Sequence, residues 1–423
     1  MEVHAEPNAK REVKHNILAS DFSFTGLLRF ALPTMGMMLF MGMYTIVDTI
    51  FVARFVHTFA LSAINICTPV LYTIVGLTGM LATGASAIIG KKMGRGENEG
   101  ARQTFSFIVL CGCALAAIFM TVGLCFLNPL LRGLGASDAL MPYCRSYLSL
   151  QLWFLPANVL SVLFQNLFVT AGRPGLGLRL SLLAGVLNIL LDYLFIVPLG
   201  MGIAGAALGT VLAFLPSAAG GMLFFASKRG NLYFVRPLFD LRELAQSCSN
   251  GVSEMVTQLS TAITTLCFNL TMMGLAGEAG VAAITIIIYT QFLLTTLFIG
   301  FSMGVAPVFS YNYGSESWQR MKRIFKSCVL FLAAASVLLF TAAFWGGDAL
   351  AGIFVEKHSA VYAMASEGFH IFSFSFLLCG FNIFSSALFT ALSNGRVSAV
   401  ISFLRTLGLI SAGLLLLPRV LGL

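Results

Sequence analysis

Long apolar segments dominate the sequence and decide its environment. Eleven of them are at least about 18 residues long, the length needed to cross the roughly 30 Å hydrocarbon layer of a bilayer. They lie near residues 27–53, 60–90, 103–127, 144–170, 176–199, 203–226, 247–273, 280–311, 325–346, 364–393 and 397–418. Segments this long predict helices, because barrel strands need only about ten alternating residues. Since 58% of the residues are hydrophobic and 10% charged, we predict an all-α polytopic membrane protein.

Basic residues are distributed unevenly between alternate loops. If the N-terminus is cytoplasmic, 19 of the 25 Lys and Arg residues fall on the cytoplasmic side, five fall outside and Arg405 lies within a span. Cytoplasmic loops of membrane proteins retain positive charge, so we expect this orientation in the cell (plasma or inner) membrane. The polar segment 1–23 lacks the apolar region of a signal peptide. The net charge of +8 comes from scattered loop residues, so no nucleic-acid partner is expected.

The two halves of the chain resemble each other at an offset of 220 residues. Residues 60–65 match 280–285, Gly84 matches Gly304, and Gly94 matches Gly314. Such repeats are common in transporters, with sites between the halves and rocking motions that alternate access. We therefore predict two pseudo-symmetric six-helix lobes. The expected boundaries are a cytoplasmic segment at 1–23, an N-lobe at 24–227, a cytoplasmic linker at 228–246 and a C-lobe at 247–423.

The end of the repeat bears on the number of helices. Residues 198–203 resemble 418–423, and in the first half Ile203 begins the sixth span. A twelfth span is therefore expected to start where the given sequence stops. We expect eleven of twelve helices in this chain.

Several short motifs together narrow the choice of transporter family. They are Pro33 followed by Asp48, GASAIIGKKMGRGE at 84–97, Asn188 with Asp192, NGVSEMVTQLS at 250–260 and FIGFSMGVAPVFSYNYG at 298–314. Over residues 25–420 the chain resembles the multidrug and toxic compound extrusion (MATE) family, part of the multidrug/oligosaccharidyl-lipid/polysaccharide flippase superfamily. The resemblance implies export of cationic amphiphilic compounds in exchange for inward protons or sodium ions.

A cation site is also indicated by the residues themselves. Asp48, Asp192 and Thr210 all fall roughly 10 Å below the outer surface in the expected topology. Asn188 and Asp192 are four residues apart, so they share one helical face. A charged carboxylate in the bilayer core is costly and usually faces a cavity, a partner or an ion. Protonation or sodium binding would neutralise the pair; the alternative is that these residues only hydrogen-bond helices together.

The resemblance assigns roles to individual positions. Asp48, Asn188, Asp192 and Thr210 match the N-lobe cation site of some family members, and the first three would be ligands of a coupled sodium ion. Pro33 matches a proline associated with bending of the first span. No cofactor other than the coupling ion is implied.

The second half offers a different polar group. Glu254 and Gln258 share a face near the cytoplasmic end of the seventh span, where they can attract a cationic substrate, form a second ion site or pack helices, with Arg405 as a possible partner for Glu254. Broad recognition of amphiphilic cations favours apolar walls with few polar groups. Further candidates for the substrate pathway are Tyr44, Gln165 and Asn166.

Other functional classes have less support. Residues 200–205 satisfy GxGxxG but follow a membrane span, and no Walker A, HExxH or GxSxG motif occurs, so neither a nucleotide nor an enzymatic activity is expected. We expect a monomer in the lipid bilayer that handles small cationic molecules. Two alternatives stay open: a lipid-linked saccharide flippase, for which a strongly cationic central cavity is expected, and a channel or non-transporting receptor.

Overall fold

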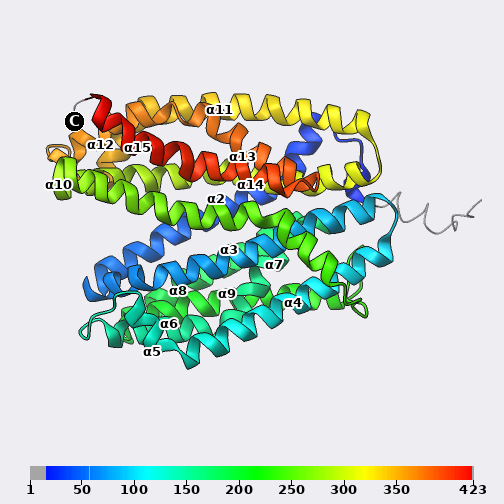
Figure 1. Ribbon diagram of the computed structural model, residues 1–423, viewed down its shortest axis with the longest axis horizontal. Helices are drawn as coiled ribbons and strands as arrows, with labels where there is room; N and C mark the ends of the chain where they lie inside the picture. Colours follow the sequence, from blue (N-terminus) through cyan, green and yellow to red (C-terminus); the bar gives the residue numbers. More distant parts are fainter. Residues whose placement is uncertain (1–15, 57, 422–423) are drawn as a thin grey trace, which may run out of the picture.

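The computed structural model describes residues 16–56 and 58–421, and these residues form helices joined by turns. A short helix, η1 (Ile17–Ala19), precedes the first lobe, which contains α2 (Phe24–Phe55), α3 (Thr58–Gly94), α4 (Asn98–Cys125), α5 (Leu127–Gly133), α6 (Met141–Trp153), α7 (Leu155–Thr170), α8 (Pro174–Ile196) and α9 (Gly202–Ala226). The second lobe contains α10 (Leu241–Gly314), α11 (Trp318–Phe354), α12 (Ala360–Ser373), α13 (Phe376–Ala391), α14 (Gly395–Phe403), η2 (Leu404–Gly408) and α15 (Leu409–Leu421). The N-lobe (α2–α9) and the C-lobe (α10–α15) lie side by side (Figure 1).

The helix α10 is two spans rather than one. Its 74 residues would extend about 110 Å as a straight helix, several times the thickness of a bilayer. At Gly277 the backbone leaves the helical region, with φ 62° and ψ −153°, and the chain folds back (Figure 1). Glycine adopts this conformation without a Cβ clash. We call residues 241–276 the first arm of α10 and residues 278–314 its second arm.

The predicted spans are all found in the described part of the chain. Eight helices are long and apolar enough to cross a membrane, and two bent pairs raise the number to ten. The bent pairs are α6 with α7 and α12 with α13. Because α10 supplies two spans, the described residues hold the eleven that the apolar segments predict.

The internal repeat is visible in the helix boundaries. Helix α3 covers 58–94 and the second arm of α10 covers 278–314, at an offset of 220 residues. The fourth span of each lobe is a bent pair, with bends of 55° and 57°. The prediction of two pseudo-symmetric lobes is therefore confirmed.

The lobes meet through contacts that the repeat duplicates. A Cβ at Gly94 would overlap the Tyr311 carbonyl oxygen, and one at Gly314 would overlap the Lys91 carbonyl oxygen. Gly94 and Gly314 are repeat equivalents, and so are Lys91 and Tyr311. The pseudo-twofold axis that relates the lobes therefore maps one of these contacts onto the other. Glycine allows the two helix backbones to approach this closely.

A second pair of contacts follows the same symmetry. A Cβ at Gly84 would lie 2.8 Å from the Gly251 nitrogen, and one at Gly304 would lie 3.1 Å from the Ala31 Cα. Gly84 is the equivalent of Gly304, and Ala31 is the equivalent of Gly251. The lobes are closely joined at the end that carries η1 and the turns 95–97, 227–240, 315–317 and 392–394. We call it the basic end; it lies on the right in Figure 1.

Aromatic clusters form part of the core of each lobe. In the N-lobe the ring of Phe225 lies 4.7 Å from that of Phe105 and 5.4 Å from that of Phe164. In the C-lobe the ring of Phe384 lies 6.2 Å from that of Phe325. Phe164 and Phe384 are repeat equivalents, as are Phe105 and Phe325. Tilted ring pairs of this kind bury large apolar areas in the core of each lobe.

Candidate functional site

Two neighbouring helices place the predicted acidic residues together. Gly185 of α8 packs against α2, since a Cβ there would lie 2.9 Å from the Tyr44 ring. Asp48 follows one turn after Tyr44, and Asn188 and Asp192 follow Gly185 in the next two turns of α8. As a result the carboxyl groups of Asp48 and Asp192 interact electrostatically, and Asn188 lies beside Asp192. We call these three residues the acidic site.

The polar atoms of the acidic site are buried and unsatisfied. Asp192 is 0% exposed and Asn188 is 2% exposed. Within the described residues, no hydrogen bond reaches either carboxylate oxygen of Asp192, Oδ1 of Asp48 or Oδ1 of Asn188. Buried polar atoms without partners cost free energy. The oxygens of the site therefore suit a proton or a small hard cation.

Helix α9 approaches the acidic site through Gly209 rather than Thr210. A Cβ at Gly209 would overlap Oδ1 of Asp192 and would lie 3.1 Å from its Cγ. The Thr210 hydroxyl donates to the Ala206 carbonyl at 3.0 Å, within its own helix. Sequence reasoning missed Gly209, although the spacing of Gly205 and Gly209 is the small-residue pattern of close helix contacts.

Helix α6 adds two buried residues that sequence reasoning also missed. Tyr147 is 9% exposed and Gln151 is 6% exposed. Tyr147 interacts electrostatically with both Asp48 and Asp192, and Gln151 lies beside Tyr147. Their spacing of four residues places both on one face of α6, as it does for Asn188 and Asp192 on α8. A polar pair at this spacing in an apolar span, like the pair on α8, is the sequence feature that could have identified them.

The predicted pathway residues are not all brought to this site. Tyr44 lies beside Asp48 and interacts with it electrostatically. On α7, the Gln165 amide lies 3.5 Å from the Ser161 hydroxyl, and the Asn166 amide donates to the Val162 carbonyl at 3.1 Å. Both α7 side chains thus bond within their own helix.

The residues Glu254 and Gln258 form a separate polar group at the interface between the lobes. The Gln258 amide donates to Glu254 Oε1 at 3.1 Å. Glu254 packs on Gly79 of α3, where a Cβ would lie 2.7 Å from Glu254 Cγ. The charge of Arg405, in the π-helical turn η2, acts on Glu254, but the described residues contain no ion pair within 4 Å between them.

The turn around Pro33 is seated against the second arm of α10. Helix α2 continues through Pro33. A Cβ at Gly300 would lie 2.6 Å from the Met35 Cα, and one at Gly304 would overlap the Thr34 hydroxyl. The Thr34 hydroxyl donates to the Ala31 carbonyl at 2.7 Å, next to the position where proline removes a backbone donor. The two α10 glycines thus provide the space for this turn.

Two pseudo-symmetric helical lobes and a buried acidic site define a membrane transporter built from an internal repeat. The MatE family model matches residues 33–194 and 254–413. One match lies in each lobe, and their starting points are 221 residues apart, close to the repeat offset. The chain belongs to the MATE family, which consists of transporters rather than enzymes.

Individual relatives have low sequence identity to this chain but align over most of its length. The multidrug export protein MepA of Staphylococcus saprophyticus subsp. saprophyticus is 24% identical over 386 residues, which cover 90% of this chain and 84% of that protein. A multidrug resistance MATE family transporter solved in an outward-facing conformation aligns over 90% of this chain and 85% of its own, with a TM-score of 0.85 and 22% identity. A Pyrococcus furiosus transporter of the same superfamily, noted for the reverse polarity of its binding pocket, covers 92% and 88% with a TM-score of 0.84 and 21% identity. These structures support the two-lobed fold.

Proposed function

We propose that this protein is a secondary active multidrug efflux transporter that exports cationic amphiphilic compounds in exchange for inward protons or sodium ions. The observation that carries the proposal is the buried group formed by Asp48, Asn188 and Asp192, in which four oxygens (Oδ1 of Asp48, Oδ1 of Asn188 and both of Asp192) lack hydrogen-bond partners in the described chain. The name of the related MepA protein supports multidrug export.

The acidic site couples the ion to the conformation in this proposal. Two carboxylates that lie close together in a buried place repel each other when both are charged. A proton or sodium ion removes this repulsion and stabilises the conformation that buries the site. Asp48, Asn188 and Asp192 supply the primary ligands of a sodium ion. The Thr210 oxygen retains lone pairs for a weaker contribution while its proton is donated to Ala206.

The energy available to such an exchange is limited. One pH unit supplies about 1.4 kcal/mol per proton. One charge that crosses 100 mV supplies about 2.3 kcal/mol. Exchange of one monovalent cation for one ion is electroneutral, so the membrane potential would drive export only at a higher ion stoichiometry.

The proposed orientation assigns the conformation to a state of the transport cycle. With a cytoplasmic N-terminus in the plasma or inner membrane, the basic end faces the cytoplasm, so the close contacts there belong to an outward-facing state. Glu254 and Gln258 attract the cationic substrate from the cytoplasmic side. Tyr44 lies next to the acidic site, and Gln165 and Asn166 are further candidates for the pathway. Adjustment of α2 near Pro33 accompanies substrate release.

The proposal is tested by efflux of a fluorescent organic cation from proteoliposomes under an imposed pH gradient or an imposed sodium gradient. We expect saturable efflux that one of the two gradients drives, and that Asp192→Asn abolishes. Asp138→Asn is the matched control, because Asp138 is 97% exposed and lies in the turn between α5 and α6. Undiminished gradient-driven efflux in Asp192→Asn, or flux that neither gradient drives, would refute the proposal.

A further inference from the structure

A large cavity lies between the two lobes at the basic end. Its volume is about 570 Å³, within the range of small-molecule sites. The N-lobe contributes the end of α3, and the C-lobe contributes the starts of α10 and α14. The charged side chains that line it are five bases and one acid: Lys91, Lys92, Arg95, Arg242, Arg396 and Glu243.

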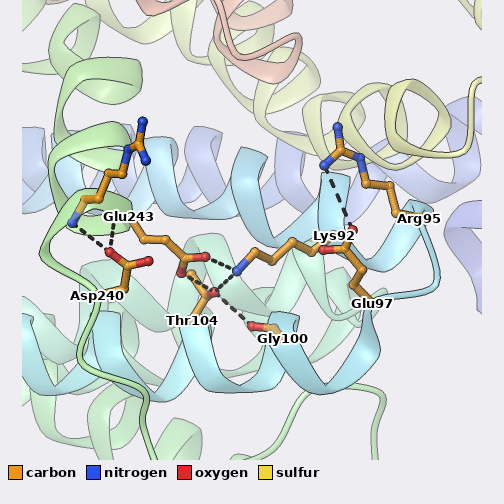
Figure 2. Close-up of polar contacts among 8 residues, drawn as sticks. Lys92, Arg95, Glu97, Gly100, Thr104, Asp240 and Glu243 are labelled. Atoms are coloured by element: carbon orange, nitrogen blue, oxygen red, sulfur yellow. Dashed lines mark hydrogen bonds and ion pairs between the residues drawn. The ribbon is translucent and has the colours of Figure 1, made fainter.

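The one lining acid is already engaged. Glu243 forms an ion pair with Lys92, and its second oxygen accepts a hydrogen bond from the Thr104 hydroxyl at 2.7 Å (Figure 2). Arg95 lies 4.0 Å from Glu97, in a pair whose side chains are both about half exposed. Exposed pairs of this kind contribute little. The cavity therefore has an excess of positive charge that its own acid does not cancel.

Three basic side chains carry most of this excess. The Lys91 ammonium lies 5.0 Å from the centre of the Tyr313 ring. Arg242 and Arg396 are exposed, and the ion pairs found among the described residues do not include them. These three residues are available to a ligand of opposite charge.

The backbone and one buried amide add to the site. Helix α14 begins at the cavity wall, with Asn394 capping the Val397 nitrogen, and a helix N-terminus favours a bound anion. Asn250 is 5% exposed and lines the cavity. Its amide nitrogen donates to the Thr390 carbonyl at 2.9 Å, whereas its Oδ1 has no partner among the described residues. That oxygen is itself buried, so the amide forms part of the cavity wall rather than a ligand contact.

We propose that this cavity binds a phosphate group, carried either by an anionic phospholipid headgroup or by a soluble phosphate compound. Arginine side chains match the geometry of phosphate oxygens, and lysine supplies additional charge. Basic pockets between membrane helices are suited to anionic headgroups. A cationic substrate would be repelled here, so the site is separate from the acidic site.

Occupancy of the cavity has a conformational consequence. Lys91, Lys92 and Arg95 belong to the N-lobe, whereas Arg242 and Arg396 belong to the C-lobe. A phosphate group held by both lobes stabilises the conformation in which the basic end is closed. This consequence rests on the proposed transport cycle, but the binding itself does not.

The test measures binding without transport. Thermal unfolding of the purified protein is followed in detergent with and without inorganic phosphate, and in nanodiscs of phosphatidylcholine with and without phosphatidylglycerol. A ligand of the folded state raises the unfolding temperature. The double variant Arg242→Gln/Arg396→Gln removes two unpaired charges, and Arg229→Gln removes an exposed charge outside the cavity lining.

We expect stabilisation of the wild type and of Arg229→Gln, with binding about 30-fold weaker in the double variant if each charge contributes as it does near an anionic membrane surface. Stabilisation by inorganic phosphate identifies a soluble phosphate ligand, and stabilisation only by phosphatidylglycerol identifies a lipid headgroup. No stabilisation by either probe, or equal stabilisation of the wild type and the double variant, would overturn the proposal. Since transport is not measured, failure here leaves the proposed export function standing.

Discussion

The fifth span differs between the two lobes more than the shared fold would suggest. In the N-lobe, α8 is a regular helix from Pro174 to Ile196 that buries Asp192. In the C-lobe, the corresponding span is interrupted by a π-helical turn from Leu404 to Gly408 that contains Arg405. The Thr264 hydroxyl donates to the Thr406 carbonyl at 2.6 Å, which satisfies one carbonyl of this turn. Such π-turns arise where a helix accommodates local strain or function.

The comparison shows that a symmetric scaffold carries an asymmetric set of charges. The N-lobe gathers two acids and an amide from α2 and α8, and four of their oxygens are buried without protein donors in the described chain. The equivalent of Asp48 at the repeat offset is Phe268, an apolar residue. The C-lobe instead carries a half-buried base, Arg405, whose charge acts on Glu254. We infer that ion coupling belongs to the N-lobe and that the C-lobe contributes the complementary surface.

The largest expected effect comes from the two acids of the N-lobe. Asp48→Asn and Asp192→Asn should each lower ion-driven efflux at least about tenfold, a loss of about 1.4 kcal/mol or more. Residues that act as one unit are not additive, so the double variant should lose little more than either single variant. The measurement is the initial rate of efflux from proteoliposomes under the effective ion gradient.

Thermal stability separates a coupling role from a structural one. Asp192→Asn should not lower the unfolding temperature, because within the described residues neither carboxylate oxygen has a hydrogen bond to lose. A marked loss of stability together with additive losses of efflux would mean that the acids mainly hold the helices together.

A smaller effect is expected at the glycine that faces the carboxylate. Gly209→Ala places a methyl group against Oδ1 of Asp192, and such overpacking costs roughly 1–3 kcal/mol. We expect the affinity for the coupling ion to fall about tenfold, measured as the ion concentration that half-saturates efflux. Gly220→Ala is the matched control on the same helix, because its Cβ would meet a flexible side-chain end of Leu180 at 2.7 Å. Equal effects at both glycines would argue against a specific role for Gly209.

The architecture could be predicted because bilayer thickness fixes the length of each apolar helix. The same argument does not locate the bends near Phe154 and Ser375, because bilayer thickness limits the length of an apolar segment and not its straightness. The turn at Gly277 falls in the predicted gap between the spans at 247–273 and 280–311, although the sequence does not single out the residue that turns. Glycine is frequent in membrane helices, so its positive φ is visible only in the structure.

The acidic site was predictable to the extent that burial of charge is costly. Asp48, Asn188 and Asp192 stand out in apolar segments, and the structure places them together. Hydroxyl and amide groups do not stand out in this way, because their bonds to their own helix, as in Thr210 and Asn166, cannot be read from sequence. The basic cavity was missed because its residues lie far apart in the chain and resemble ordinary loop charges.

The smallest effect on ion coupling is expected from Arg405, the half-buried base of the C-lobe, and it is the sharpest check of the comparison. Arg405→Gln removes a charge whose Nε has no hydrogen-bond partner among the described residues, so the protein should not be destabilised. The ion dependence of efflux should change less than about twofold. The half-saturating substrate concentration should shift by roughly threefold, or about 0.7 kcal/mol, since the charge that acts on Glu254 is lost. If Arg405→Gln instead abolished the ion dependence as Asp192→Asn does, the two lobes would share one coupling network, because a charge in the C-lobe would then control a site whose ligands all lie in the N-lobe.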